Sequence, residues 1–231
     1  MRRRTLMGAT AAAAGLPATA RAQPEPVDLA LVLAVDVSRS VDDEEARLQR
    51  EGYRRAIMDP RVLSGITGGM IGAICVTYVE WAGWQFQTQT IPWTRVSGGA
   101  EATRFASAIS EMPRVSLNWT SISGAIRFSM EVLANCPFDP TRQVIDISGD
   151  GVNNSGPPVD ELRDQAVAKS VIINGLPIVN DRPGFGWLPP GALEQHYRER
   201  VIGGPGAFVI VADGFEAFDQ AVLRKLIREI A

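Results

Sequence analysis

The sequence predicts a mostly parallel, three-layer α/β sandwich with helices on both faces of a central sheet and one antiparallel edge strand. Near-continuous apolar runs, which are typical of strands buried on both faces, recur along the chain. Segments suited to helices lie between these runs, as parallel connections require. One segment, residues 84–93, instead alternates apolar and polar residues, as does an edge strand with one hydrated face.

Each expected element follows from its own residues. Apolar or alternating stretches mark strands at 28–35, 70–82, 84–93, 142–148, 171–176 and 207–213. Helices are expected at 42–58, 99–112, 121–136, 159–170 and 214–230. Asp42 is a candidate N-cap of the first helix, whose acidic first turn suits the helix dipole. The last helix is amphipathic, with an apolar stripe formed by Phe215, Phe218, Val222, Leu226 and Ile230.

Residues 1–22 have the layout of a signal peptide. Three arginines precede a mildly apolar stretch rich in Ala, Gly and Thr, and a small-x-small cleavage site lies at 20–22. The paired arginines favour the twin-arginine type, and a disordered basic tail is the alternative. We therefore expect an exported chain, periplasmic or secreted, with a linker at 23–27 and one domain at 28–231. A Pro- and Gly-rich insertion at about 176–206 is too long for an ordinary connection.

Composition excludes several classes of partner. The chain has 231 residues, 45% of them hydrophobic, which is enough for one sizeable core. No apolar run reaches the roughly 18 residues that span a bilayer, so no stable membrane insertion is expected after signal cleavage. Cleavage would remove four arginines and no acidic residue, which takes the formal net charge from −3 to −7. An acidic domain without a basic cluster is poorly suited to nucleic acid or anionic lipid, whereas a cation or a cationic partner fits.

The two cysteines leave two possibilities open. Export permits a disulfide between Cys75 and Cys136. Cys75 lies in an apolar run, however, where a buried free thiol is common, and the sequence favours free thiols.

Oxygen-bearing side chains follow the first apolar run at every second position. Asp36, Ser38 and Ser40 offer one carboxylate and two hydroxyls. Hard cations such as Mg²⁺ prefer oxygen ligands and usually keep some waters. Asp150 comes just after another predicted strand, separated from it by Gly149, and the carboxyl ends of parallel strands share the sheet edge at which ligands bind.

The pattern "DVSRS" at 36–40 resembles the D-x-S-x-S motif of the von Willebrand factor type A (VWA) family. Two further motifs of that family occur in order. Thr120 precedes Ala125 and Ile126 in "TSISGAI", and Asp150 begins "DGVNN" after a predicted strand. The resemblance covers residues 28–231. Within the family, the sequence is similar to a group of exported bacterial proteins with this domain and no assigned function.

The resemblance implies a Rossmann-like sandwich with a metal-ion-dependent adhesion site. Its five metal ligands would be Asp36, Ser38, Ser40, Thr120 and Asp150. The cation would be Mg²⁺, with Mn²⁺ or Ca²⁺ as alternatives, and an Asp or Glu of an unidentified partner protein would complete its coordination. The sequence departs from the family in two places: "SLNWT" replaces the usual glycines before the threonine, and Gly149 stands directly before Asp150, where the family usually has Thr or Ser.

Each candidate ligand also has an interpretation without a metal. Asp36 fits a strand-end carboxylate, and Ser38 and Asp150 fit ordinary turn residues. Ser40 could cap the next helix with Asp43 as its reciprocal partner, and Thr120 could be the N-cap of the helix that follows it. Among their neighbours, Asp146 inside a strand needs a structural partner, Trp119 fits either the binding face or the core, and Asn153 and Asn154 fit either loop support or plain turns.

A binding module is the preferred function class, and no catalytic residue is expected. The chain has a single histidine, His196, no G-x-S-x-G elbow and no P-loop ending. A Mg²⁺-dependent hydrolase that uses an aspartyl phosphate would need a second aspartate two residues after Asp36, where Ser38 stands. The alternatives are therefore a structural or interaction domain with a vestigial metal site and, less favoured, that hydrolase.

Overall fold

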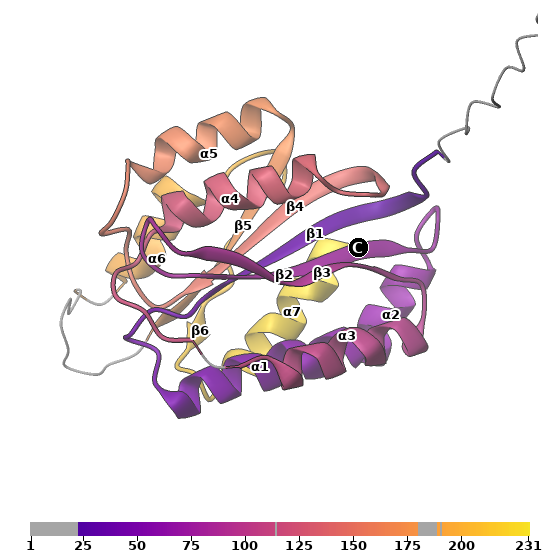
Figure 1. The fold of residues 1–231 in the computed structure, drawn as a ribbon, viewed down its shortest axis with the longest axis horizontal. Coiled ribbons are helices and arrows are strands. Elements are labelled where there is room, and N and C mark those ends of the chain that lie inside the picture. Colours follow the sequence, from indigo (N-terminus) through magenta and orange to yellow (C-terminus); the bar gives the residue numbers. More distant parts are fainter. Residues whose placement is uncertain (1–22, 114, 180–188, 190) are drawn as a thin grey trace, which may run out of the picture.

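A six-stranded sheet with helices on both faces forms the described part of the chain (Figure 1). The computed structural model describes residues 23–113, 115–179, 189 and 191–231, so the expected signal peptide at 1–22 lies outside them. The strand order is β3-β2-β1-β4-β5-β6, and all neighbouring strands run parallel except β2 and β3. The predicted fold class, including the antiparallel edge strand, is confirmed.

The elements have the following bounds. The strands are β1 (Pro26–Asp36), β2 (Ile74–Trp81), β3 (Gln87–Val96), β4 (Asp139–Gly149), β5 (Val171–Val179) and β6 (Ala212–Asp213). The helices are α1 (Asp43–Met58), α2 (Pro60–Thr67), α3 (Gly99–Glu111), α4 (Ile122–Ala134), α5 (Val159–Ala168), α6 (Ala192–His196) and α7 (Phe218–Ile230), and a π-helical turn, η1 (Tyr197–Val201), continues α6.

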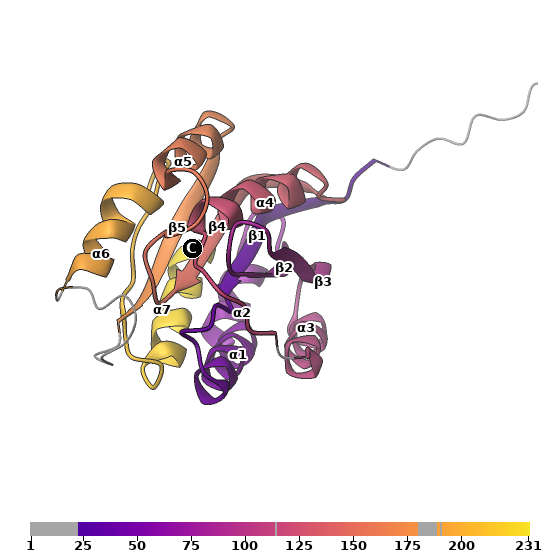
Figure 2. The ribbon, with the colours of Figure 1, turned by 60° about the vertical axis from the view of Figure 1, so that its left-hand side comes forward.

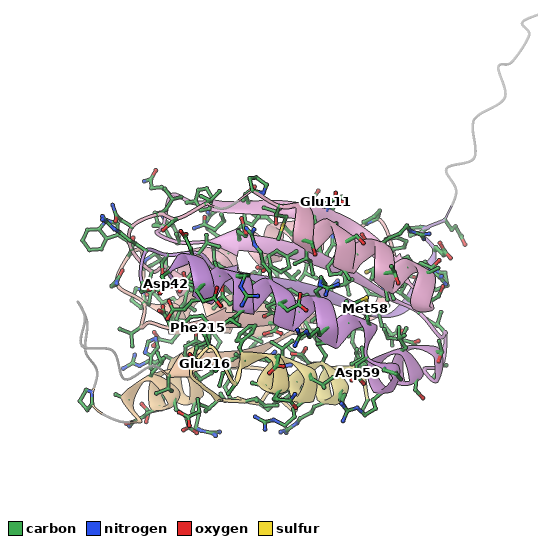
Figure 3. All side chains as sticks on the ribbon, turned by 90° about the horizontal axis from the view of Figure 1, so that it is seen from below. Asp42, Met58, Asp59, Glu111, Phe215 and Glu216 are labelled. Carbon is green, nitrogen blue, oxygen red and sulfur yellow. The ribbon has the colours of Figure 1, made fainter. Side chains whose placement is uncertain are left out.

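The central strand β1 divides its side chains between two hydrophobic cores, because successive residues of a strand point to opposite faces. Leu29, Leu31 and Leu33 pack on the face covered by α1, α2, α3 and α7. Ala30 and Val32 pack on the other face, under α4 and α5. Figure 2 shows α6 beside α5 on that second face, and Figure 3 shows α1 lying between α3 and α7 on the first.

Helix α1 begins with the capping residue that the sequence predicts. The Glu45 N–H donates to Asp42 Oδ1 over 2.9 Å, and the Asp42 N–H donates to Glu45 Oε2 over 2.7 Å. This reciprocal capping box fixes where the chain leaves the β1–α1 loop (Figure 3).

Two predicted strands are shorter than expected. The strand expected at 70–82 begins only at Ile74, because the preceding turn uses its amides for another purpose: the N–H groups of Ile71 and Gly72 donate to the Asp28 carboxylate. The strand expected at 207–213 is regular only over Ala212–Asp213. Its Phe208 N–H donates to the side chain of Asn174, and Val209 pairs with Gly175 of β5 in an isolated bridge.

The expected insertion at 176–206 is partly regular structure. Strand β5 continues to Val179, and α6 and η1 occupy 192–201. Tyr197 and Val201 are fully buried in the second core, so this part of the insertion covers the sheet. Residues 180–188 and 190 of the insertion lie outside the described residues.

Asp146, inside β4, has the structural partner that its burial demands. Its Oδ1 lies 2.6 Å from Lys225 Nζ on α7, and Lys225 also pairs with Glu229. Burial raises the pKa of Asp146 to about 7, the Lys225 charge opposes this, and the Glu229 charge adds to it. This cluster joins the sheet to α7 and identifies Lys225 as the structural partner that the sequence predicts for Asp146 without naming it. Of the described helices, none has the length and apolar character that crossing a bilayer would need.

Candidate metal centre

Parallel pairing brings two acidic residues to one edge of the sheet. β1 pairs with β4 so that Val35 lies beside Ser148, and Asp36 and Asp150 follow at the carboxyl ends of these strands. Thr120 lies in the loop before α4. The next residue in that loop, Ser121, ties it to the same edge, because the Ser121 N–H donates to the carbonyl of Ala82 just after β2. Ser40 and Asp150, which are 110 positions apart in the sequence, therefore meet at this edge.

A chain of hydrogen bonds links four of the five predicted ligands. The Ser38 N–H donates to Asp36 Oδ1 over 2.7 Å, and Ser38 Oγ lies 3.0 Å from Ser40 Oγ. Ser40 Oγ in turn donates to Asp150 Oδ1 over 2.7 Å. The oxygens of Asp36, Ser38, Ser40 and Asp150 thus form one continuous cluster.

The fifth predicted ligand, Thr120, is fixed against the Asp150 loop by its backbone. Its N–H donates to Asn154 Oδ1 over 2.8 Å, and its carbonyl accepts the Asn154 N–H over 2.9 Å. A Cβ added to Gly151 would lie 3.4 Å from Thr120 Oγ1, so the Thr120 hydroxyl faces the residue after Asp150.

Two of the interpretations without a metal are wrong in this structure. The cap of α1 is Asp42 and not Ser40, because the Asp42 carboxylate accepts the Glu45 N–H. The cap of α4 is Ser121 and not Thr120, because Ser121 Oγ accepts the Gly124 N–H over 3.1 Å. Neither Ser40 nor Thr120 is used by a helix end.

The electrostatics of the cluster are unfavourable without a cation. Asp36 is fully buried, and its Oδ2 has no hydrogen-bond donor. Burial, followed by the nearby charge of Asp150, holds the pKa of Asp36 well above its usual range. Burial also raises the pKa of Asp150. Two adjacent carboxylates that both resist ionisation are stabilised by a positive charge between them.

The donor set fits a hard divalent cation. It consists of carboxylate and hydroxyl oxygens, which Mg²⁺ and Mn²⁺ accept, and the unsatisfied Asp36 Oδ2 is the atom that most needs a partner. Within the described residues, no cluster of three or more His, Cys, Asp or Glu side chains has a metal-binding arrangement. A site here would therefore depend on the serine and threonine hydroxyls as well as on the two aspartates.

Gly149 explains one departure from the VWA pattern. A Cβ at this position would come within 2.9 Å of Asp36 Oδ2 and 3.1 Å of the Trp81 ring. A Thr or Ser at position 149 has no room beside these two side chains. Glycine at position 149 therefore leaves room for the buried side chain of Asp36. Asp150 still accepts a hydrogen bond from Ser40.

Neighbouring residues support the loops or line the surface. Asn153 Oδ1 accepts the Ser123 N–H and Ser123 Oγ, so Asn153 and Asn154 both tie the Asp150 loop to the start of α4. Of the two roles that the sequence left open for them, loop support is the one observed. Trp119 is 65% exposed and has φ 72°, so it lies outside the core in a backbone conformation that is rare for a large side chain. His196 lies beside an open pocket formed with Asn153, Pro158, Val159, Asp160 and Arg200.

Comparison with known proteins gives a family and a fold. The model of the family described as "Protein of unknown function (DUF1194)" matches residues 26–231. No curated protein is similar to this chain in sequence.

Several solved structures share the fold at low sequence identity. Proximal thread matrix protein 1 from the mussel byssus has a TM-score of 0.61 and 13% identity, over 89% of this chain and 47% of that one. A von Willebrand factor type A structure from Catenulispora acidiphila has 0.60 and 11%, over 88% and 43%. The pilus adhesin SpaC from Lactobacillus rhamnosus GG has 0.60 and 15%, over 91% and 31%. The fold is therefore VWA-like, and this chain spans less than half the length of each of these three proteins.

Proposed function

Since the chain belongs to the DUF1194 family of proteins of unknown function, we propose a function from its site: a metal-dependent module that binds a partner protein. Asp36, Ser38, Ser40, Thr120 and Asp150 would hold Mg²⁺ or Mn²⁺. The observation that carries this proposal is the fully buried Asp36, whose Oδ2 has no donor and whose neighbour is a second carboxylate.

The proposed metal ligands orient one another through hydrogen bonds. The Ser38 N–H orients the Asp36 carboxylate, and Ser40 connects Ser38 to Asp150. Because Asp42 caps α1 and Ser121 caps α4, the Ser40 and Thr120 hydroxyls are available for another partner. A bound divalent cation would supply the charge that neutralises Asp36 and Asp150, and an open position for an acidic side chain of the partner.

A structure of the mussel protein with the same fold has, by its description, a zinc-occupied MIDAS motif (TM-score 0.61, 13% identity, over 88% of this chain and 46% of that one). We extend to this chain only the idea that this edge of the fold can hold a divalent cation. Trp119, exposed beside Thr120, would contact the partner next to the cation. From residues 1–22 we further propose an exported protein that acts in the periplasm.

Two other functions remain as alternatives. In the first, the domain is structural and its metal site is vestigial. In the second, a Mg²⁺-dependent hydrolase, Asp36 would need a general acid two residues later. Ser38 stands there instead, and it is 2% exposed and hydrogen-bonded within the cluster. That arrangement favours binding over catalysis.

Isothermal titration tests the metal. Mg²⁺ or Mn²⁺ titrated into the wild-type chain should give saturable binding, and the Asp36→Ala variant should give none. Asp164→Ala is the matched control, because that exposed aspartate pairs with its neighbour Arg163 on α5, away from the candidate site. Absence of binding in the wild-type chain would leave the vestigial site as the correct interpretation.

A pull-down from a periplasmic extract tests the partner. The wild-type chain and Asp164→Ala should retain the same protein in Mg²⁺ and lose it in a chelator. Asp36→Ala should lose it under both conditions. A partner that stays bound in the chelator would separate binding from the metal and contradict the proposal.

A further inference from the structure

The only two cysteines of the sequence lie in contact. Cys75 Sγ and Cys136 Sγ are 3.6 Å apart, although the residues are 61 positions apart in the chain. Cys75 is fully buried in β2, and Cys136 is partly exposed just after the end of α4. The sequence alone favours free thiols, but it could not supply this distance.

The surroundings hold the two sulfur atoms together. Cys75 is fixed by the parallel pairing of β2 with β1, where it lies beside Ala30. The Cys136 N–H donates to the Leu133 carbonyl over 3.1 Å, so the turn that ends α4 fixes the second cysteine. Both side chains border the core under α4. Bond formation to about 2.05 Å therefore needs small side-chain rotations rather than movement of an element.

The two thiols differ in reactivity in a way that suits exchange. The hydrogen bond from the Cys75 thiol lowers the pKa of Cys136 to about 7. The same bond, together with burial, raises the pKa of Cys75. Cys136 is thus the partly exposed sulfur with more thiolate at neutral pH, and the thiolate is the attacking species in exchange.

We propose that Cys75 and Cys136 are a modification site at which a disulfide forms by exchange with a disulfide-bearing oxidant. The Cys136 thiolate attacks one sulfur of the oxidant, which breaks the oxidant's S–S bond and releases one thiolate. Cys75 then loses its proton to solvent and attacks Cys136 Sγ, which forms the Cys75–Cys136 bond and releases the second thiolate. The cysteine pair loses two electrons and the oxidant gains them.

The bond would join α4 to the sheet at the end away from the candidate metal centre. Cys136 follows the last turn of α4, whereas Ser121 and Thr120 lie at its first turn. Cys75 lies near the start of β2, whereas the cluster lies at the carboxyl ends of the strands. The disulfide would therefore hold the far end of the helix that follows Thr120, and it requires no metal.

Intact mass after thiol labelling tests the proposal. The full chain is incubated with oxidised glutathione or with a reductant, then unfolded and treated with N-ethylmaleimide. The oxidised sample should carry no label and weigh about 2 Da less than the unlabelled reduced chain. The reduced sample should carry two labels, one for each cysteine. Two labels, glutathione adducts or a disulfide-linked dimer after oxidation would each overturn the proposal.

Thermal melting supplies a second measurement. The oxidised wild-type chain should melt about 5 to 15 °C above the reduced chain, because the bond closes a long loop in the unfolded state. The Cys136→Ser variant should take one label under both conditions and melt at one temperature. Equal melting temperatures for oxidised and reduced wild-type chains would contradict the role of the bond in holding α4.

Discussion

Gly149 lies so close to Asp36 that a Cβ on Gly149 would come within 2.9 Å of Asp36 Oδ2. Gly149, the last residue of β4 before Asp150, and Asp36 at the end of β1 therefore share one tightly filled space. The Trp81 ring closes the same space at 3.1 Å. The position before Asp150 can thus affect both packing and metal binding.

We expect Gly149→Ala to destabilise the fold by about 1 to 3 kcal/mol, because the added methyl overpacks a filled site. It should also weaken Mg²⁺ binding, since Asp36 has to move. Urea denaturation and isothermal titration measure the two effects. Gly99→Ala is the control, because a Cβ there meets nothing closer than Leu63 Cδ1 at 4.0 Å. Equal stability of the two variants would show that the space around Asp36 is not tightly filled.

Asp36→Asn should separate stability from metal binding. Without metal this variant should be at least as stable as the wild-type chain, because it removes a buried carboxyl group whose ionisation is opposed by burial and by the charge of Asp150. Mg²⁺ at a hundredfold excess over its Kd should raise the Tm of the wild-type chain by about 5 to 10 °C and leave the variant unchanged. Differential scanning calorimetry with and without Mg²⁺ measures both. An equal Tm rise in the variant would show that Asp36 is not a ligand of the metal.

Asn154 is expected to act as a positioning residue. Its side chain and backbone hold Thr120 against the Asp150 loop without belonging to the proposed ligand set. Asn154→Ala should weaken Mg²⁺ binding by about 10- to 100-fold, as loss of outer-shell support does elsewhere. Asn135→Ala, at the opposite end of α4, should leave the affinity unchanged. Unchanged affinity in Asn154→Ala would mean that the loop is held by other contacts.

Asp146 should make the stability of the fold depend on pH. Its folded pKa of about 7 lies above the ordinary value of 3.8, because of its burial. Between these values the folded state binds more protons than the unfolded state, so this group makes the free energy of unfolding fall as pH rises from about 4 to about 7.

The Asp146→Asn variant lacks this titration. The difference in free energy of unfolding between wild type and variant should therefore shift in favour of the variant as pH rises through that window. Urea denaturation at several pH values measures the difference. A constant difference between pH 4 and pH 7 would show that Asp146 stays ionised throughout, held by Lys225.

Trp119 should contribute to partner binding rather than to stability. It is largely exposed and has φ 72°, a region that Asn tolerates better than Trp. Trp119→Asn should therefore be at least as stable as the wild-type chain and retain Mg²⁺ binding, yet lose the partner in the pull-down. Met70→Ala is the control, because Met70 is 97% exposed and lies at the other end of the sheet. Undiminished capture by Trp119→Asn would exclude it from the interface.

The architecture and the sheet edge of the expected site follow from local patterns in the sequence. Apolar runs such as that of β1, and the helix signals between them, are local patterns, and local patterns suffice to predict a parallel sheet. The same rules predicted Asp42 as the cap of α1 and a partner for Asp146. They failed for most of the strand expected at 207–213, where Asn174, far from Phe208 in the sequence, accepts the Phe208 N–H and Val209 forms an isolated bridge to β5.

Which polar groups meet depends on the packing of the whole fold. The hydrogen bond between Ser40 and Asp150, the fit of Gly149 beside Asp36 and the contact between Cys75 and Cys136 each join distant parts of the chain. Such distances depend on how strands register and helices dock, which no local pattern encodes. The burial of Asp36 also depends on packing. The sequence shows that Asp36 ends a strand, but only the packed sheet leaves its Oδ2 without a donor.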